Sequence, residues 1–212
     1  MPSSSLKHNW TVTWNSRNKR WQMIIGTVIV AAMIYSLPFF FAYIQKRKGV
    51  VLNDWLLARI PPHDVSAFIF GLIGALGLWI LIRAVKDPSI YITYCWTMIF
   101  VYIVRFVTLS LVALDPPIGL VPLIDPLSSF FSGNTVITKD LFFSGHTATM
   151  VQIYLCLNKR TDKMVALIAA VAVACLLLVQ HIHYTVDVLA APMVVYPCYL
   201  LTRYLFFKVE RS

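Results

Sequence analysis

The chain has 212 residues, of which 59% are apolar and only 13% are charged. Because a soluble domain carries about 25% charged residues, this composition excludes a water-soluble globule and predicts a protein embedded in a lipid bilayer. The net charge of +9 would fit nucleic-acid binding, but the Lys and Arg residues lie in short clusters between apolar runs. That placement favours topology signals and anionic lipid headgroups, and we expect no nucleic-acid partner.

The chain begins with a polar segment, residues 1–20, that has no apolar core. We expect a cytoplasmic tail there, disordered or interfacial, and no cleavable signal peptide. Six apolar segments follow that are long enough, or nearly so, to cross about 30 Å of hydrocarbon at about 1.5 Å per residue. They cover residues 21–44, 66–82, 89–114, 141–157, 164–183 and 186–207. The sequence therefore predicts an all-α membrane protein, a six-helix transmembrane bundle over residues 21–207 with a short tail at 208–212.

The distribution of basic residues predicts the orientation of this bundle. With the N-terminus in the cytoplasm, twelve Lys and Arg residues lie on the cytoplasmic side and five on the other, and Arg105 lies inside the third span. The cluster at 46–48 is on the side with five and argues the other way. The overall bias places both termini in the cytoplasm.

Two short segments place titratable groups at the ends of apolar spans. The first, residues 140–147, reads Asp-Leu-Phe-Phe-Ser-Gly-His-Thr, and the second, residues 183–188, reads His-Tyr-Thr-Val-Asp-Val. In the predicted topology both lie at the non-cytoplasmic end of the bundle, facing the lumen or the outside. Two His and two Asp residues at one membrane depth supply the groups for acid–base and nucleophilic chemistry.

The spacing within these segments indicates a role for each residue. Asp187 lies four residues after His183, so that on a helix the two share a face. A carboxylate at one imidazole nitrogen fixes the tautomer and leaves the other nitrogen as nucleophile or base. His146 would exchange protons with the leaving or attacking oxygen. Ser144 and Gly145 would let backbone N–H groups at a helix start approach a phosphoryl oxygen.

Single residues of this kind are weak signals, and their combination is the stronger one. His181 alone is best interpreted as an interfacial or hydrogen-bonded side chain, and a lone Ser-Gly-His is common. The pairing of Ser-Gly-His-Thr with His-Tyr-Thr-x-Asp-Val, one span apart, is far more specific. Arg105, about two turns inside the third span, would be costly without a partner, so we expect a phosphate or an acidic residue beside it.

The pair of motifs resembles the C-terminal membrane domain of the sphingomyelin synthase family, a branch of the PAP2-type lipid phosphatase superfamily. That family has Cys-Gly-Asp-x3-Ser-Gly-His-Thr, which here starts at Asp140 with Thr138 and Lys139 before it, and His-Tyr-Thr-x-Asp-Val, which is intact. Two further stretches are similar to family motifs, and Pro192 stands where the family has Tyr. These stretches are Tyr102-x2-Arg105-x2-Thr108 and Pro61-Pro62-His63-Asp64. The resemblance covers about residues 60–207.

The resemblance implies a fold of the PAP2/sphingomyelin synthase type and a phospholipid headgroup phosphotransferase that needs no metal or cofactor. It implies His183 as nucleophile on phosphorus, Asp187 as its partner and His146 as the acid–base group. The residues implied for substrate binding are Arg105, Ser144, Gly145, Tyr102, Asp140, Tyr184 and Asp64. A phosphocholine- or phosphoethanolamine-type headgroup would pass from a glycerophospholipid to a lipid alcohol such as ceramide or diacylglycerol.

Two other functions remain open from the sequence. PAP2 phosphatases hold a phosphomonoester with Lys-x6-Arg-Pro and an Arg six residues before the nucleophilic His, whereas Leu177 stands at that position here. This difference favours a singly charged phosphodiester substrate and headgroup transfer. It disfavours a phosphatase that hydrolyses lipid phosphate monoesters. A non-enzymatic lipid-binding protein is the second alternative. The headgroup, the acceptor and the oligomeric state stay open; Tyr91, Tyr94, Trp96 and Tyr184 are candidate aromatics around a choline.

Overall fold

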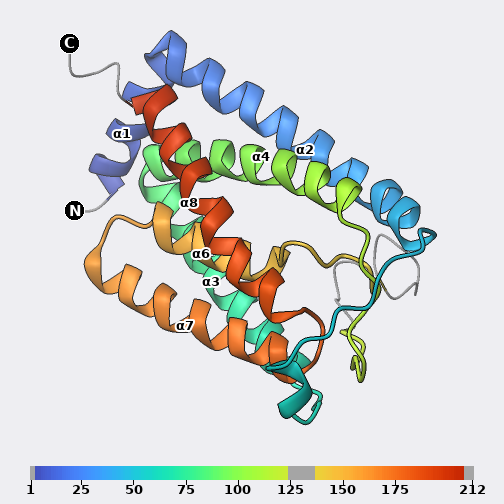
Figure 1. Cartoon of the computed structure of the whole chain (residues 1–212). Coiled ribbons are helices and arrows are strands. Elements are labelled where there is room, and N and C mark those ends of the chain that lie inside the picture. Colours follow the sequence, from blue (N-terminus) through green and yellow to red (C-terminus); the bar gives the residue numbers. More distant parts are fainter. Residues whose placement is uncertain (1–2, 124–136, 208–212) are drawn as a thin grey trace.

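The computed structural model describes residues 3–123 and 137–207, with side chains described from residue 9 onward. The helices are α1 (Ser3–Asn15), α2 (Arg17–Gln45), η1 (Leu57–Arg59), α3 (Ser66–Lys86), α4 (Pro88–Leu111), α6 (Gly145–Cys156), α7 (Arg160–Val179) and α8 (Thr185–Phe207) (Figure 1). Apart from an isolated bridge between Val50 and Leu114, these ranges contain no strand, so the predicted all-α class is confirmed. The tail predicted at 208–212 lies outside the described residues.

Five of these helices, α2, α3, α4, α7 and α8, are long and apolar enough to cross a membrane. The chain is therefore an integral multi-pass membrane protein by length and composition. The fourth predicted span, 141–157, differs from the structure, in which α6 begins only at Gly145 and has 12 residues. A helix of that length is about 18 Å long, short of the hydrocarbon thickness. The predicted count of six spans is not confirmed.

The short helix α6 lies at the centre of the bundle, packed against α7, α8, α4 and α3 (Figure 1). Its buried side chains Met150 and Ile153 join a core with Ile69 of α3 and Val173 of α7. In contrast, α2 lies at the periphery and exposes apolar side chains such as Phe39 along its length. Apolar exposure of this kind suits contact with lipid rather than water.

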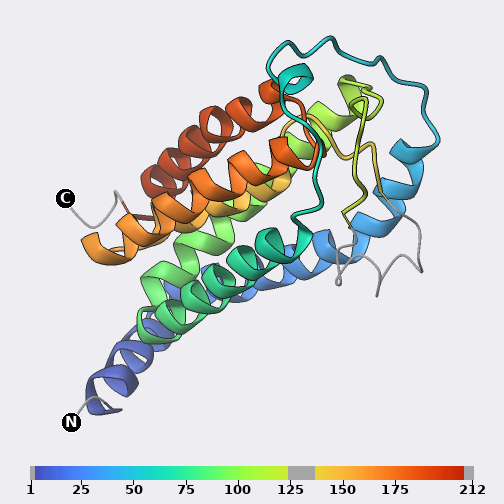
Figure 2. The ribbon, with the colours of Figure 1, turned by 90° about the horizontal axis from the view of Figure 1, so that it is seen from below.

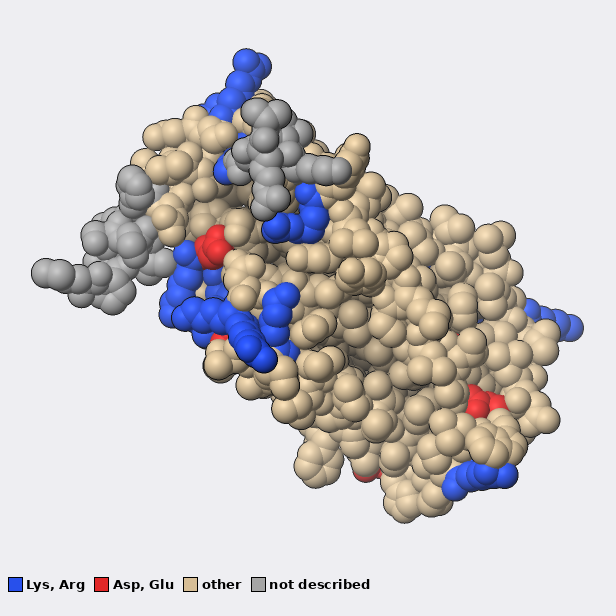
Figure 3. Space-filling model, turned by 60° about the vertical axis from the view of Figure 1, so that its left-hand side comes forward, with Lys and Arg blue, Asp and Glu red and all other residues tan. Residues whose placement is uncertain are grey.

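The long connections between the helices lie together at one end of the bundle. The segments 46–65, 112–123 and 137–144 and the short turn 180–184 gather at one end (Figure 2). On the face in Figure 3, most of the Lys and Arg side chains lie toward opposite ends, with a wide region free of them between. Both sequence motifs are at the end with the long connections, as the alternation of helix direction predicts. The side of the membrane that this end faces stays a prediction.

The polar N-terminal segment forms helix α1, although the sequence left a disordered or interfacial tail open. Trp10 of this helix contacts one end of the bundle, and the two motifs lie at the other end. The Trp10 indole N–H donates to the Val85 carbonyl at 2.6 Å, and its ring lies 6.3 Å from that of Tyr91. An indole with one hydrogen-bonding edge and an apolar body is well suited to such an interfacial position.

Candidate active site

The N-termini of α6 and α8 meet and bring the two sequence motifs together. The backbone N–H of Ser144 donates to the carbonyl of Asp187 at 3.0 Å. The ring centroids of His146 and His183 lie 6.3 Å apart, and Phe70 of α3 lies against His146 at 6.5 Å. Two segments that α7 separates in the sequence thus form a single site.

His183 and Asp187 form a buried pair at this junction. His183 Nδ1 lies 3.6 Å from Asp187 Oδ2, and the two side chains are 2% and 0% exposed. That separation is an ion-pair distance and longer than a hydrogen bond; within the described part of the chain, His183 Nδ1 and Asp187 Oδ1 have no hydrogen-bond partner. Catalytic hydrogen bonds are often long before substrate binds. With Nδ1 turned to the carboxylate, Nε2 is the ring nitrogen left for chemistry.

Asp187 is oriented by the first turn of its own helix. Helix α8 begins at Thr185, two residues after His183 and within one residue of the predicted sixth span, 186–207. Asp187 Oδ2 accepts from the Tyr184 backbone N–H at 3.0 Å, the reach-back bond of a capping box. The carboxylate that faces His183 therefore also satisfies a backbone donor at the helix start, which restricts its rotamer.

Arg105 on α4 projects into the start of α6. It is 3% exposed, and its Nη1 donates to the carbonyl of Phe143 while its Nη2 pairs with Asp140 Oδ1. The expected acidic partner is thus Asp140, the first residue of the first motif. The guanidinium bonds the carbonyl two residues before α6 begins at Gly145, next to a helix N-terminus at which the helix dipole also favours an anion.

Gly145 makes the approach of Arg105 possible. A Cβ atom at position 145 would lie 2.8 Å from Cζ and Nη2 of Arg105, closer than any ordinary contact. An Arg head group can move, but here it would lose its bonds to Phe143 and Asp140. The requirement for Gly at this position is therefore steric and acts through the guanidinium.

We expect Gly145→Ala to displace the Arg105 guanidinium, at a cost of about 1–3 kcal/mol for overpacking and with a loss of turnover. The matched control is Gly74→Ala on α3, where a new Cβ meets no atom within 4 Å. The thermal midpoint and turnover of both variants in detergent check this. Equal behaviour of the two variants would contradict the steric role of Gly145.

The Ser144 side chain caps α6. It is fully buried, and its Oγ accepts from the Thr147 backbone N–H at 3.3 Å and from the Thr147 hydroxyl at 3.1 Å. Ser is among the preferred N-cap residues for this reason. Its contribution to the site is the placement of the helix start that carries Gly145 and His146.

A second cation near the site, Lys139, is already paired. Its Nζ lies 2.7 Å from Asp115 Oδ1 and also donates to the Arg47 carbonyl. As a hydrogen-bond donor, Lys139 lowers the pKa of the Asp115 carboxyl below its ordinary value. Lys139 therefore neutralises a loop carboxylate, whereas Arg105 contacts the α6 start directly.

The remaining predicted substrate-binding residues lie less centrally. Tyr102 is one turn before Arg105 on α4, partly buried, with its ring 6.3 Å from that of Phe106. Asp64 is exposed and bonds the backbone N–H and hydroxyl of Ser66 at the start of α3; these bonds lower the pKa of its carboxyl. Within the described residues, neither side chain hydrogen-bonds to His183 or Asp187, so the roles of Tyr102 and Asp64 stay predictions.

The aromatic residues suggested for a headgroup cage do not gather at the site. Tyr91, Tyr94 and Trp96 lie in the first half of α4, about 14–21 Å along the helix from Arg105 at about 1.5 Å per residue. The Tyr184 hydroxyl is engaged by loops: it donates to the Asp115 carbonyl at 2.9 Å and accepts from the Leu52 N–H at 3.1 Å. The suggested cage is wrong for the α4 residues.

The structure adds two residues that sequence reasoning did not place at the site. Asp54 bonds Thr185, which lies between His183 and Asp187 in the chain. His181, expected to be a hydrogen-bonded side chain, contacts the carbonyls of Ile118 and Ile60 through its two ring nitrogens. Because Asp54 is more than 130 positions from Thr185 in the sequence, no local pattern signals this contact.

The C-terminal helices of the chain match a family of known proteins. Residues 139–204 match the family model described as PAP2 superfamily C-terminal. The match includes His146, His183 and Asp187 but not Arg105. It supports the PAP2 superfamily, and with it an enzyme of the lipid phosphatase or phosphotransferase type that acts on lipids in the membrane. No curated protein matches the chain.

Proposed function

We propose that the chain is a phospholipid headgroup phosphotransferase of the sphingomyelin synthase-like kind. The observation that carries the proposal is the position of the His183 ring, which has the Asp187 carboxylate at Nδ1 and the ring of His146 beside it. This arrangement supplies a nucleophile, its charge partner and a separate acid–base group within one buried site. The donor is a glycerophospholipid, and the acceptor is ceramide or another lipid alcohol.

The reaction has two displacements at phosphorus. In the first, His183 Nε2 attacks phosphorus and the bond to the diacylglycerol oxygen breaks, while His146 donates a proton to that oxygen. The headgroup phosphate is then bound to Nε2, and Asp187 balances the positive imidazole. In the second, His146 takes the proton of the acceptor hydroxyl, whose oxygen attacks phosphorus, and the bond to Nε2 breaks. Free His183 is restored.

The charges at the site favour a phosphodiester. Arg105 already shares its charge with Asp140, and Lys139 is paired with Asp115. A buried dianion would need more unpaired positive charge than this arrangement provides. A diester carries one negative charge, which the guanidinium and the α6 start can balance. The substrate is therefore a phosphodiester, and the group transferred is the phosphate together with its headgroup rather than a free phosphate.

The same intermediate would make the protein a hydrolase if water reached it, so the acceptor decides between the two activities. We expect purified protein, given a labelled phospholipid together with ceramide, to yield diacylglycerol and the headgroup-bearing ceramide in equal amounts by mass spectrometry. Free phosphoheadgroup or inorganic phosphate as the main product would show a hydrolase. The basic-residue bias predicts that this site faces the lumen or the outside.

A further inference from the structure

The segment between α2 and α3, residues 50–65, crosses the turn that carries His183, and we refer to it as the strap. Among the described residues, the hydrogen bonds between the strap and the turn engage residues on either side of Ile182 and His183. They are His63 N–H to the Val179 carbonyl, Val65 N–H to Gln180 Oε1, His181 Nε2 to the Ile60 carbonyl, Leu52 N–H to the Tyr184 hydroxyl and Thr185 N–H to Asp54. The strap thus fastens the turn before and after the candidate nucleophile.

Asp54 makes the contact between the strap and the start of α8. Its Oδ2 accepts from the Thr185 backbone N–H at 2.6 Å, and its Oδ1 accepts from the Thr185 hydroxyl at 3.0 Å. The same Oδ1 accepts from the backbone N–H groups of Leu56 and Leu57 at 3.1 and 3.0 Å. One carboxylate therefore caps both η1 in the strap and the N-terminus of α8, which lies in another part of the chain.

The electrostatics agree with a capping carboxylate. Partial burial raises the pKa of Asp54, but the hydrogen bonds from Thr185, Leu57 and Leu56 outweigh it, so that the net pKa lies below the ordinary value. The first N–H groups of a helix have no partner within the helix, and the positive end of the helix dipole favours a negative charge there. Asp54 supplies both needs of α8 from outside the helix.

We propose that Asp54 is a positioning residue for the His183–Asp187 pair. Thr185 lies two residues after His183 and two before Asp187, so a fixed Thr185 sets the spacing at which His183 Nδ1 faces the carboxylate. The Asp187 reach-back bond to Tyr184 depends on the same first turn of α8. The expected effect on turnover rests on the proposed function. The fixing of Thr185 and of the first turn of α8 by Asp54 does not.

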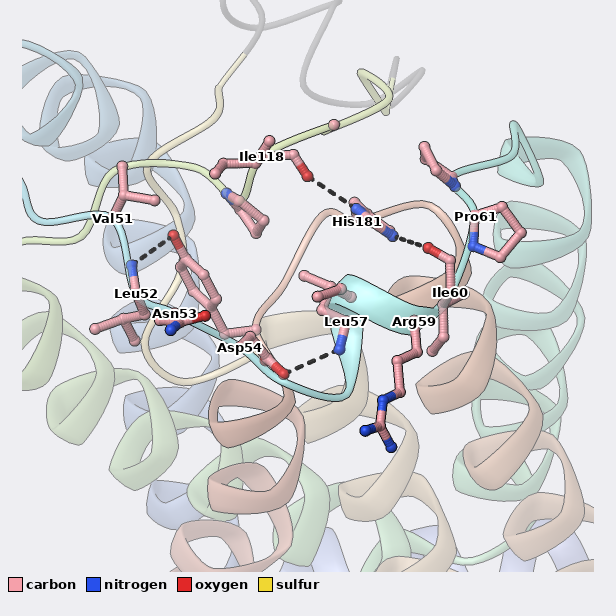
Figure 4. A pocket seen from close by; sticks show the side chains of 15 residues that line it. Val51, Leu52, Asn53, Asp54, Leu57, Arg59, Ile60, Pro61, Ile118 and His181 are labelled. Atoms are coloured by element: carbon pink, nitrogen blue, oxygen red, sulfur yellow. Dashed lines mark hydrogen bonds between the residues drawn. The ribbon is translucent and has the colours of Figure 1, made fainter.

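The strap has several contacts besides those of Asp54, so we expect the effect of a change at Asp54 to be local. His181 lies between the strap and the connection 112–123. Its Nδ1 is 2.9 Å from the Ile118 carbonyl, and its Nε2 is 2.8 Å from the Ile60 carbonyl (Figure 4). This junction borders a pocket of about 830 Å³, which Asp54 and Tyr184 also line. With the strap held at several points, loss of one carboxylate charge is expected to loosen the start of α8 and leave the fold intact.

The test is Asp54→Asn, with hydrogen–deuterium exchange and lipid turnover measured on the full chain in nanodiscs. The neutral amide keeps one acceptor oxygen and replaces the other with a donor. In either orientation of the amide, Thr185 loses one of its two bonds to residue 54, and the bond that stays is to an uncharged acceptor. We expect exchange in the peptide covering 184–188 to rise about tenfold, since a hydrogen bond to a charged group contributes at least that factor. We expect kcat to fall about tenfold with KM for the lipid unchanged.

The matched control is Asp87→Asn at the opposite end of the bundle. Asp87 Oδ1 caps α4 through the backbone N–H of Ser89 at 2.9 Å and its hydroxyl at 2.7 Å. This variant should raise exchange at the start of α4 and leave both the 184–188 peptide and turnover as in the wild type. If Asp54→Asn does not fold, Thr185→Val removes only the hydroxyl bond and should give a smaller rise in the same peptide.

Unchanged exchange at 184–188 in a folded Asp54→Asn protein would overturn the inference. Faster exchange there with unchanged kcat would also overturn the positioning role, while the proposed function would stand. Absence of turnover in the wild-type protein would instead contradict the proposed function, and exchange at Thr185 would then decide the structural role of Asp54 alone.

Discussion

Replacement of His183 by Ala is expected to abolish the burst of diacylglycerol that the wild-type protein releases from donor lipid alone. If His183 is the nucleophile, the first displacement proceeds without an acceptor and yields one diacylglycerol per active site before turnover stops. Removal of a nucleophile from a covalent enzyme costs several orders of magnitude in rate, here about 10⁴-fold or more. Rapid-quench sampling with labelled phospholipid measures the burst, and its amplitude should equal the enzyme concentration.

Variants of the neighbouring residues separate the roles within this burst. Asp187→Asn should keep the fold and slow the burst, because an amide does not stabilise the positive imidazole. His146→Ala should suppress turnover through loss of the proton donor. His63→Ala is the control, since the described bond of its ring is to the Pro61 carbonyl within the strap. A full burst in His183→Ala would exclude both the transferase and the hydrolase at this site.

Much of the fold follows from the sequence because the bilayer restricts a chain to few solutions. Backbone groups in hydrocarbon must bond within their own helix, so long apolar runs such as those around Trp79 and Val173 are readable as spans. The start of α6 was not readable in this way. Residues 141–144 are apolar or small, but Ser144 acts as an N-cap and the Phe143 carbonyl accepts from Arg105, so the helix begins later.

The sequence predicts those features of the candidate site that depend on the direction of the helices. Alternating helices put the first and second motifs at one end. The cost of a buried charge predicted a phosphate or an acidic residue beside Arg105, and the structure has Asp140 there. Contacts that depend on the path of a loop leave no periodic pattern in the sequence, so they cannot be predicted from it. The bond of Asp54 to Thr185 and the packing of Arg105 on Gly145 are of this kind, and both require the folded structure.

Arg105→Ala is expected to lower turnover about 10²–10³-fold, the scale for loss of one preorganised donor at a developing charge. Arg105→Lys should recover only part of this loss. In the structure, two different nitrogens of the guanidinium bond the Phe143 carbonyl and Asp140. A single ammonium acts as a point charge and does not reproduce that planar, two-sided geometry. Steady-state turnover of both variants, normalised to folded protein, measures the effect.

The control must separate the loss of a phosphate-binding cation from the loss of a buried ion pair. Arg83 on α3 provides it, because its Nε lies 2.7 Å from Asp162 Oδ2 at the opposite end of the bundle, and Asp162 is 5% exposed. Arg83→Ala leaves a buried carboxylate unpaired and should lower the thermal midpoint with little change in turnover per folded molecule. Arg105→Ala should lower turnover well beyond any change in its midpoint. Wild-type turnover in Arg105→Ala would assign the guanidinium a purely structural role and remove the cation on which the diester preference rests.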